Sequence, residues 1–465
     1  MKTLNSVMLS GREVLPLIEG GKGISITNWQ SSGAWAAAGG VGTVSCVNAD
    51  SFDENGTLIP QVYHGRTRRE RHEELIKYAI SGGLTQVRRA YEMAGGEGRI
   101  HINVLWEMGG AENVLKGVLD GAKDLINGIT CGAGMPYRLG EIAAKYECYY
   151  YPIISSARAF RALWKRAYHK VSDWLGGVVY EDPWRAGGHN GLSNSEDPEK
   201  PEPAFPRVLE LRQRMREMGL DETPIIMAGG VWYLRDWEDW IDNPDLGPIV
   251  FQYGTRPLLT RESPIPESWK QRLLTLRDGD VLLHRFSPTN FYSSAVHNRF
   301  LTELEERSRH QIPYSTEAVG DHQAELSIGL RKRPVYVTPG DKLRAEAWCR
   351  QGFDEPMRTP DLTLVFVTKE KRDQIRRDQI ECMGCLSACK FSNWKQGGTG
   401  STGRKADPRS FCIQKTLMNI AHGGDVENNL MFAGHSAFHF ARDPFYSNGF
   451  IPSVRQLIDR ILSGD

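Results

Sequence analysis

An α/β fold is predicted by the sequence, specifically a closed (β/α)8 TIM barrel with an inserted C-terminal accessory region that carries a four-cysteine metal cluster. Three observations lead to this prediction. Short apolar runs alternate with amphipathic stretches over the first 265 residues. Glycine makes up 48 of 465 residues, about 10% against a usual ~7%, which favours tight turns and close approaches of the backbone. Four of the eight cysteines crowd into residues 382–412.

Composition narrows the class of protein. Lys and Arg number 57, as do Asp and Glu, so the chain has no overall basic field for a nucleic acid or an anionic membrane. With 40% hydrophobic and 25% charged residues it is typical of a folded, globular protein. It shows neither a signal-peptide core at the N-terminus nor a run of ~18 apolar residues. We therefore expect a cytoplasmic protein with reduced thiols and no membrane partner, and nucleic acid is disfavoured as a partner.

Eight strand candidates alternate with helical stretches along the first 265 residues. Helical stretches such as Thr67–Met93 and Phe205–Met218 carry apolar residues at three- and four-residue spacing, as does the shorter Leu234–Ile241. Eight such units in about 250 residues favour a closed barrel over an open sheet, with the chemistry at the carboxyl ends of the strands. The expected strands are Glu13–Ile18, Val41–Val47, Ile100–Leu105, Gly128–Thr130, Tyr149–Ile154, Gly177–Tyr180, Pro224–Met227 and Pro248–Gln252.

The alternation of strand and helix candidates ends after residue 265, and this change defines the predicted domains. We expect the barrel over residues 1–265, an accessory insertion with the cysteine cluster over 266–425 and a C-terminal segment over 426–465. The later elements are predicted as helices over Ser268–Arg277, Ala295–Arg309, Lys369–Ile380 and Ser453–Leu462, and strands over Arg333–Thr338 and Leu362–Thr368.

A glycine- and histidine-containing segment, Trp184–Gly191, directly follows the strand candidate Gly177–Tyr180. Its paired glycines, Gly187 and Gly188, let a backbone approach a flat ring or a phosphate, and His189 could move protons near neutral pH. An ordinary glycine-rich turn with a surface histidine explains the same residues.

Two further strand candidates, in tandem, end in glycine. The first runs into Gly229 and Gly230, and the second, about twenty residues later, into Gly254 and Thr255. In a barrel these are consecutive late strands, whose loops commonly cradle a phosphate with backbone N–H groups. Two ordinary strand exits remain the alternative.

Taken together, these blocks resemble the nitronate monooxygenase (2-nitropropane dioxygenase) family of FMN-dependent barrels, which also contains FMN enoyl-acyl-carrier reductases. The tandem AGGH and GGV…QYGT motifs are the specific part of the resemblance. Matching blocks follow the family's order at Leu15–Gly23, Ala36–Ser45, His101–Leu105, Ala186–Gly191, Ala228–Val231, Gln252–Thr255, Thr260–Ser263 and Asn429–His435, the last being similar to the segment that returns to the barrel.

The resemblance implies a bound FMN and a proton-transferring histidine, His189. It assigns the phosphate to the backbone amides of Gly229, Gly230, Gly254 and Thr255. The remaining cofactor-binding residues it implies are Gly20, Gly21, Gly23, Asn103, Gly187, Gly188 and Gln252.

Two positions depart from the family pattern. Lys22 stands where the family usually has an apolar residue against the flavin, often Met. A buried lysine there could act in catalysis by stabilising a reduced, anionic flavin or binding an anionic substrate, whereas a shifted alignment would leave it in solvent. His435 replaces the family's closing Gln.

The cysteine cluster has C-x2-C-x3-C spacing at Cys382, Cys385 and Cys389, and Cys412 follows after 22 intervening residues. Four thiolates can hold a tetrahedral zinc or a [4Fe–4S] cluster, and a close triple with one distant cysteine favours the iron–sulfur cluster over zinc. The stretch also resembles the ligand set of Fe–S flavoprotein barrels related to dienoyl-CoA and trimethylamine oxidoreductases. Unligated thiols are the third alternative.

The expected function is an FMN-dependent oxidoreductase that oxidises nitronates or a similar small anionic substrate. One alternative is a flavin reductase, fed by NAD(P)H or the Fe–S cluster, of an enoyl, quinone or tRNA-uridine substrate. Another is an electron carrier without catalysis. The expected partners are a small-molecule substrate and NAD(P)H or a one-electron donor protein, with a homodimer as an option. No Gly-x-Gly-x-x-Gly follows a strand, so NAD(P)H would bind over the flavin.

Overall fold

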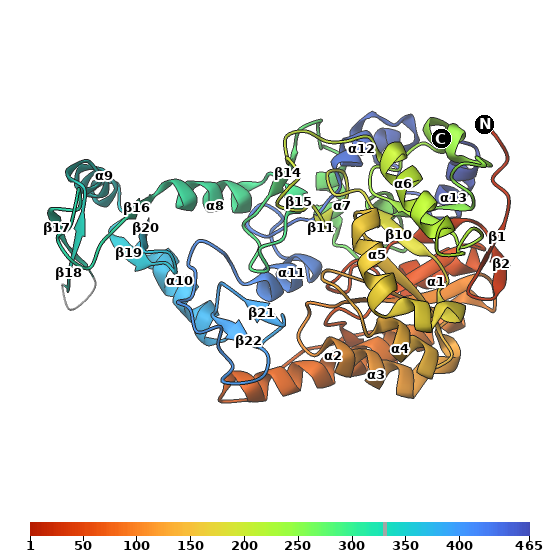
Figure 1. The fold of residues 1–465 in the computed structure, drawn as a ribbon, viewed down its shortest axis with the longest axis horizontal. Coiled ribbons are helices and arrows are strands. Elements are labelled where there is room, and N and C mark those ends of the chain that lie inside the picture. Colours follow the sequence, from red (N-terminus) through yellow and green to blue (C-terminus); the bar gives the residue numbers. More distant parts are fainter. Residues whose placement is uncertain (329–332) are drawn as a thin grey trace.

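Eight parallel strands close into a barrel in the computed structural model, which describes residues 1–328 and 333–465 (Figure 1). The strands follow one another around the barrel in chain order, and the last one pairs with the first. The predicted TIM barrel is therefore confirmed. Its strands are β3 (Leu17–Glu19), β4 (Val41–Ser45), β7 (Arg99–Leu105), β8 (Gly128–Gly132), β9 (Tyr149–Ile154), β10 (Val178–Glu181), β12 (Ile225–Ala228) and β13 (Ile249–Tyr253).

The first strand prediction, Glu13–Ile18, was wrong in extent. Its start belongs to a separate antiparallel hairpin, β1 (Val7–Leu9) with β2 (Arg12–Val14), and only its end reaches the barrel. The hairpin turn docks beneath the barrel, where the Ser10 hydroxyl lies 2.9 Å from His101 Nε2 and 2.7 Å from the Tyr151 hydroxyl. The hairpin thus closes the amino-terminal end, and the carboxyl end stays accessible.

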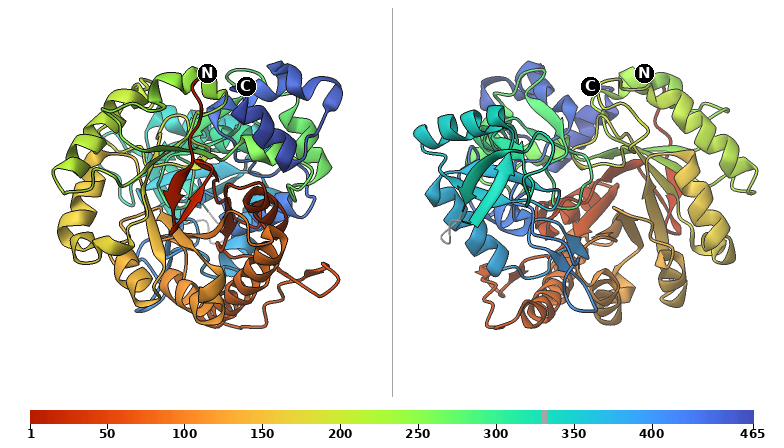
Figure 2. Two further views of the ribbon diagram at one scale, coloured as in Figure 1. Left: turned by 90° about the vertical axis from the view of Figure 1, so that its right-hand side faces the viewer. Right: turned by 60° about the vertical axis from the view of Figure 1, so that its left-hand side comes forward.

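Helices surround the barrel (Figure 2). The longest begins at Thr67, which forms a capping box with Glu70, and ends at Gly95 in the left-handed conformation. The predicted helix Leu234–Ile241 is instead a 3-10 helix over Leu234–Trp240. The α-helices are α1 (Trp29–Ala37), α2 (Arg68–Ala94), α3 (Ala111–Ala122), α4 (Leu139–Lys145), α5 (Ala157–Arg166) and α6 (Ala204–Arg216), and a small hairpin joins β5 (Ser51–Phe52) to β6 (Leu58–Ile59).

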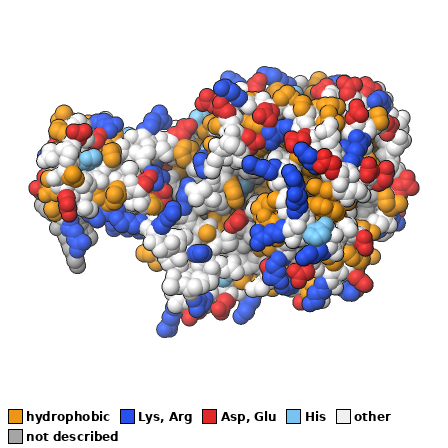
Figure 3. Space-filling model, in the orientation of Figure 1, with side chains coloured by type: hydrophobic (Ala, Val, Ile, Leu, Met, Phe, Trp, Pro, Cys, Tyr) orange, Lys and Arg blue, Asp and Glu red, His pale blue; other side chains and the backbone are white. Residues whose placement is uncertain are grey.

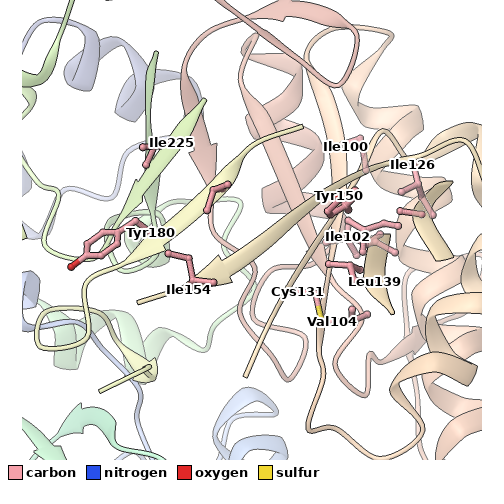
Figure 4. Close-up of a cluster of buried hydrophobic side chains, with 14 of the residues drawn as sticks. Ile100, Ile102, Val104, Ile126, Cys131, Leu139, Tyr150, Ile154, Tyr180 and Ile225 are labelled. Carbon is pink, nitrogen blue, oxygen red and sulfur yellow. The ribbon is translucent and has the colours of Figure 1, made fainter. Parts of the chain in front are cut away.

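Strand side chains alternate between two apolar layers. The outward layer packs under the helices and includes Ile102, Tyr150 and Tyr180 (Figure 4). The inward layer, with Tyr151 and Val179, fills the barrel itself. Side chains alternate along a strand, so the residue two positions after an inward-facing residue also faces the barrel interior, nearer the carboxyl end of the strand.

The accessory region begins beside the barrel and then leaves it. A three-stranded sheet joins β14 (Val281–His284) and β15 (Ser293–Val296) to β11 (Gly188–His189) of the barrel loop. Helix α8 (Arg299–Arg309) then extends outward to a small lobe (Figure 1). The lobe contains β16 (Gln311–Pro313), β17 (Ala324–Ile328), β18 (Arg333–Val337), α9 (Pro339–Arg350), β19 (Glu355–Arg358) and β20 (Thr363–Val367).

The predicted helix Ala295–Arg309 was therefore wrong over its first residues. Residues up to Val296 belong to β15, and the helix starts only after Asn298, whose side chain accepts a hydrogen bond from the Leu301 N–H. Cross-strand pairing with β11 and β14 outweighs helix propensity at this point. Helix α10 (Lys369–Ile380) has the predicted bounds, whereas α7 (Glu267–Leu273) ends before the predicted Arg277.

The chain then returns to the barrel through β21 (Ala388–Cys389), β22 (Trp394–Lys395), α11 (Ile413–Ala421), α12 (His439–Arg442) and α13 (Val454–Leu462). Helix α13 inserts Leu457, Ile458 and Ile461 into the apolar layer around the barrel. Within the described ranges, every helix is too short or too polar to cross a membrane. Acidic and basic side chains are interspersed on the face shown in Figure 3.

Replacing Leu457 by Ala should lower the free energy of unfolding by about 2–5 kcal/mol, because the side chain is fully buried and a cavity would remain. Chemical denaturation measures this change. Arg455→Ala is the matched control on the exposed face of the same helix and should change stability by less than about 0.5 kcal/mol. Equal effects of the two substitutions would show that α13 is not part of the barrel core.

Candidate functional site

A cavity opens at the carboxyl ends of the barrel strands and contains about 1760 Å³ of empty space, part of it continuous with solvent. The residues predicted to bind FMN or transfer protons all line this cavity. Their individual roles stay predictions, but the structure does bring them together. They are Gly20, Gly21, Lys22, Gly23, Asn103, Gly187, Gly188, His189, Gly229, Gly230, Gln252, Gly254 and Thr255.

The cavity floor is the last inward-facing layer of the barrel. It carries polar side chains on three strands, Asn103, Glu181 and Gln252. The first strand exit crosses above them so closely that a Cβ at Gly21 would lie 2.3 Å from the Asn103 Cβ, and one at Gly20 would lie 3.0 Å from Gln252 Nε2. Glycine is therefore required for the backbone to pass over this floor.

Unpaired main-chain donors collect at the ends of β12 and β13. Gly229 and Gly230 have φ values of +91° and +81°, which favour glycine. Among the described residues, the N–H groups of Gly229, Gly230, Gly254 and Thr255 have no hydrogen-bond partner. A Cβ at Gly254 would meet no atom within 4 Å, so open space begins at the backbone. Convergent N–H groups next to open space are suited to binding an anion such as a phosphate.

His189 is held by the accessory region. Its Nε2 lies 2.6 Å from the Ser287 hydroxyl, which lies 2.8 Å from the Thr289 hydroxyl at the cavity wall. The surrounding protein desolvates the ring and lowers the pKa of His189 to about 4, so the imidazole is neutral at neutral pH. Its Nδ1 forms no hydrogen bond within the described chain, which leaves this atom for a ligand.

Lys22 lies in the cavity wall rather than in solvent. Its Nζ donates a hydrogen bond to the Gly20 carbonyl at 2.8 Å and lies 3.6 Å from Glu19 Oε1. Burial lowers the pKa of Lys22 and raises that of Glu19. The lysine amine thus lies against an adjacent carboxyl group and does not stand free in the cavity.

Several polar cavity residues escaped the sequence interpretation, among them Glu181, Glu107 and Thr289. Glu181 could have been found, since it lies two residues after the inward-facing Val179 at a strand end. Glu107, whose carboxylate accepts a hydrogen bond from Ser387 at 2.5 Å, and Thr289 carry no motif. Their placement depends on contacts between the barrel and the accessory region.

The outer wall of the cavity is apolar and comes largely from the accessory region and the returning segment. Helix α11 reaches the cavity next to Asn48, which donates a hydrogen bond to Gln414 Oε1 at 2.8 Å. A ligand therefore meets a polar floor and an apolar cover. The apolar residues of this wall include Leu258, Trp269, Phe291, Leu386, Ile413, Leu417, Ile420 and Phe432.

The four predicted metal ligands gather in one apolar cluster, and Cys385 also lines the cavity. Burial is the main cause that raises the pKa of Cys385, and the other three thiols raise it further. Cys382 Sγ lies 3.1 Å from the Ser392 hydroxyl, so this sulfur is engaged within the chain. In residues 1–328 and 333–465, no three His, Cys, Asp or Glu side chains are arranged to hold a metal ion. The predicted metal centre at Cys382, Cys385, Cys389 and Cys412 is thus not formed in this arrangement and stays a prediction.

Comparison with known proteins supports the fold. No family model and no curated protein matches the sequence. The enoyl reductase domain of MlnA from the macrolactin biosynthesis cluster of Bacillus amyloliquefaciens has a TM-score of 0.53 at 12% identity, covering 97% of this chain and 93% of that domain. FabK from Thermotoga maritima has a TM-score of 0.52 at 14% identity, covering 97% and 92%. Nitroalkane oxidase from Streptomyces ansochromogenes has a TM-score of 0.45 at 16% identity, covering 62% and 79%. The chain therefore shares its fold with the MlnA domain and FabK over nearly its whole length.

Proposed function

We propose that the protein is an FMN-dependent oxidoreductase whose active site is the cavity at the carboxyl end of the barrel. The observation that carries this proposal is the set of unpaired N–H groups at Gly229, Gly230, Gly254 and Thr255, which face the same cavity as His189. FMN, when bound, supplies the hydride-transfer chemistry of such an enzyme.

The residues present fit this cofactor. The four N–H groups would hold its phosphate, and Gly254 leaves space for the phosphate because no atom approaches its Cβ position within 4 Å. The polar floor at Asn103 and Gln252 would hold the ring. The turn over Gly20–Gly23 provides a wall without side chains on which a flat ring can lie.

His189 would be the group that moves a proton on or off the substrate. Its neutral ring presents Nδ1 to the ligand while Ser287 holds Nε2, so the ring keeps one orientation. Lys22 would contribute together with Glu19, which lies 3.6 Å away and sets an amine and a carboxyl group side by side at the cavity wall.

Two substrate classes are candidates for this site. Oxidation of a nitronate or a similar small anion follows from the sequence motifs. NAD(P)H-fed reduction of an enoyl substrate is the second candidate. The apolar outer wall, with Ile413 and Leu417, suits a hydrocarbon chain, and the MlnA domain, an enoyl reductase by name, shares the fold.

Gly254→Ala should weaken FMN binding by at least about tenfold, because the added methyl group occupies the space proposed for the phosphate without striking the protein. Fluorescence titration of the apoprotein measures the dissociation constant. Gly340→Ala is the matched control: its Cβ also meets no atom within 4 Å, but it lies in α9 of the distant lobe. Wild-type protein that takes up no FMN would disprove the proposal.

His189→Ala should lower turnover about 10²- to 10⁴-fold, the usual contribution of a proton-transferring group, and should leave FMN affinity within about twofold of wild type. Two assays cover the two substrate classes: nitronate with oxygen, and NAD(P)H with an enoyl thioester. A variant that retains full turnover would remove His189 from the mechanism. Wild-type protein that binds FMN yet turns over neither substrate would favour the electron carrier.

The cysteine cluster is a separate proposal: we infer that Cys382, Cys385, Cys389 and Cys412 bind an iron–sulfur cluster when the protein is assembled with iron. Support comes from the motif spacing and from the burial of these thiols in one group. Anaerobically purified protein should contain about four iron atoms per chain and lose them in Cys412→Ser. One zinc ion per chain would show that the four cysteines bind zinc instead. Metal-free wild-type protein would show that they are unligated, structural thiols.

A further inference from the structure

We propose that Glu181 binds the ligand on the barrel floor as a neutral carboxylic acid, donating a hydrogen bond to the buried edge of a planar heterocycle that carries carbonyl or imine acceptors. The inference rests on the proposed function, since FMN is such a heterocycle. Nothing in the sequence motifs assigns a role to this residue.

Position supports this role. Glu181 is the last residue of β10 and has the inward orientation of Val179, two residues earlier. The strand register places Glu181 beside Ala228, and Ala228 beside Gln252. The small Ala228 side chain leaves the space between the carboxyl and the Gln252 amide to a ligand, and all three residues line the cavity.

Glu181 is also the one acid of the cavity wall for which the described chain offers no hydrogen bond or ion pair. Glu107 accepts a hydrogen bond from Ser387, and the nearby Glu19 lies against Lys22. A polar group inside a protein costs free energy unless it is hydrogen-bonded. Glu181 is half-buried and borders the cavity, so a ligand that supplies a hydrogen-bond partner would take the place of solvent there.

The groups around Glu181 keep it protonated. Removal from water raises its pKa to about 8, and the adjacent charge of Asp182 adds to the shift. Asp182 itself is paired with Arg185 at 3.2 Å. From the neighbouring strands, the tyrosines of β9 precede Ile153, the partner of Val179, and the Tyr151 hydroxyl contacts Ser10 at the amino-terminal end of the barrel. Strand β12 contributes no titratable group.

Across the cavity, the remaining charged groups do not neutralise an ionised Glu181. Lys22 is engaged with Glu19, and His189 is uncharged at neutral pH. A neutral carboxyl group has an O–H donor, whereas the ionised form only accepts hydrogen bonds and would repel a ligand carbonyl. Ligand binding should therefore weaken as pH rises through the pKa of Glu181.

The test is FMN affinity between pH 6.5 and 9 for wild type, Glu181→Gln and Glu181→Ala. Wild type should lose about tenfold in affinity across this range, the equivalent of one hydrogen bond. Glu181→Gln retains a donor and should bind as tightly as wild type at pH 6.5 without that loss. Glu181→Ala should bind about tenfold more weakly throughout. Titrations of FMN itself are common to all three proteins and cancel in the comparison.

Parallel pH profiles for wild type and Glu181→Gln would overturn the inference while leaving the flavin proposal intact. Absence of FMN binding to wild type at every pH would instead overturn the proposed function on which the inference rests.

A second measurement without cofactor tests the protonation directly. The folded state holds the proton up to about pH 8 and the unfolded chain releases it near its ordinary pKa, so stability should fall as pH rises between these values. The thermal midpoint of the wild-type apoprotein should fall relative to Glu181→Gln between pH 6 and 8. A difference in thermal midpoint that stays constant over this pH range would contradict a protonated Glu181 in the folded protein.

Discussion

The parallel barrel imposes the constraint on which the site depends: all eight strands end on one face, and a strand that ends leaves main-chain N–H groups without partners. At the ends of β12 and β13 these groups stay unpaired within the described residues because Gly229, Gly230 and Gly254 turn the chain without side chains that could cover them. An anion that lies there satisfies several donors at once. The proposed affinity for a phosphate would thus originate in backbone geometry, and the side chains of the floor would select what is attached to that phosphate.

The accessory region completes the cavity from the other side. Its strand β15 pairs with β11, which fixes His189 opposite Ser293, and Ser287 holds the imidazole from the same region. The cysteine segment pairs with the loop after β7, at Met108 with Leu386, and so places an apolar cover over the polar floor. The lobe beyond α8 takes no part in these contacts (Figure 1), so the sequence between β15 and the cysteines combines a cavity wall with a projecting arm.

Periodicity predicted the barrel because its strands are buried on both sides and read as short apolar runs separated by glycine. The same rule failed at residues 295–296, where a strand pairing between regions replaced the predicted helix. The helical stretch at residues 234–240 formed as 3-10 turns with a kink at Trp237. The glycines and His189 were found through local motifs, and the structure places them together. Ser287 and Thr289 were missed because their function depends on contacts nearly a hundred residues apart in sequence, which spacing does not encode. For the four cysteines, spacing predicted proximity but could not predict coordination geometry.

The electrostatics of the cavity would assign anion binding and proton transfer to different groups. Both titratable groups that face the ligand without a counter-charge, Glu181 and His189, are uncharged at neutral pH because the same desolvation raises the pKa of the acid and lowers that of the base. Lys22 Nζ, in the cavity wall, lies 3.6 Å from Glu19 Oε1. Recognition of negative charge would therefore fall to the N–H dipoles at the strand ends, which do not titrate near neutral pH. The neutral base His189 would then be free to exchange a proton with a substrate, while Glu181 keeps its proton as a hydrogen-bond donor.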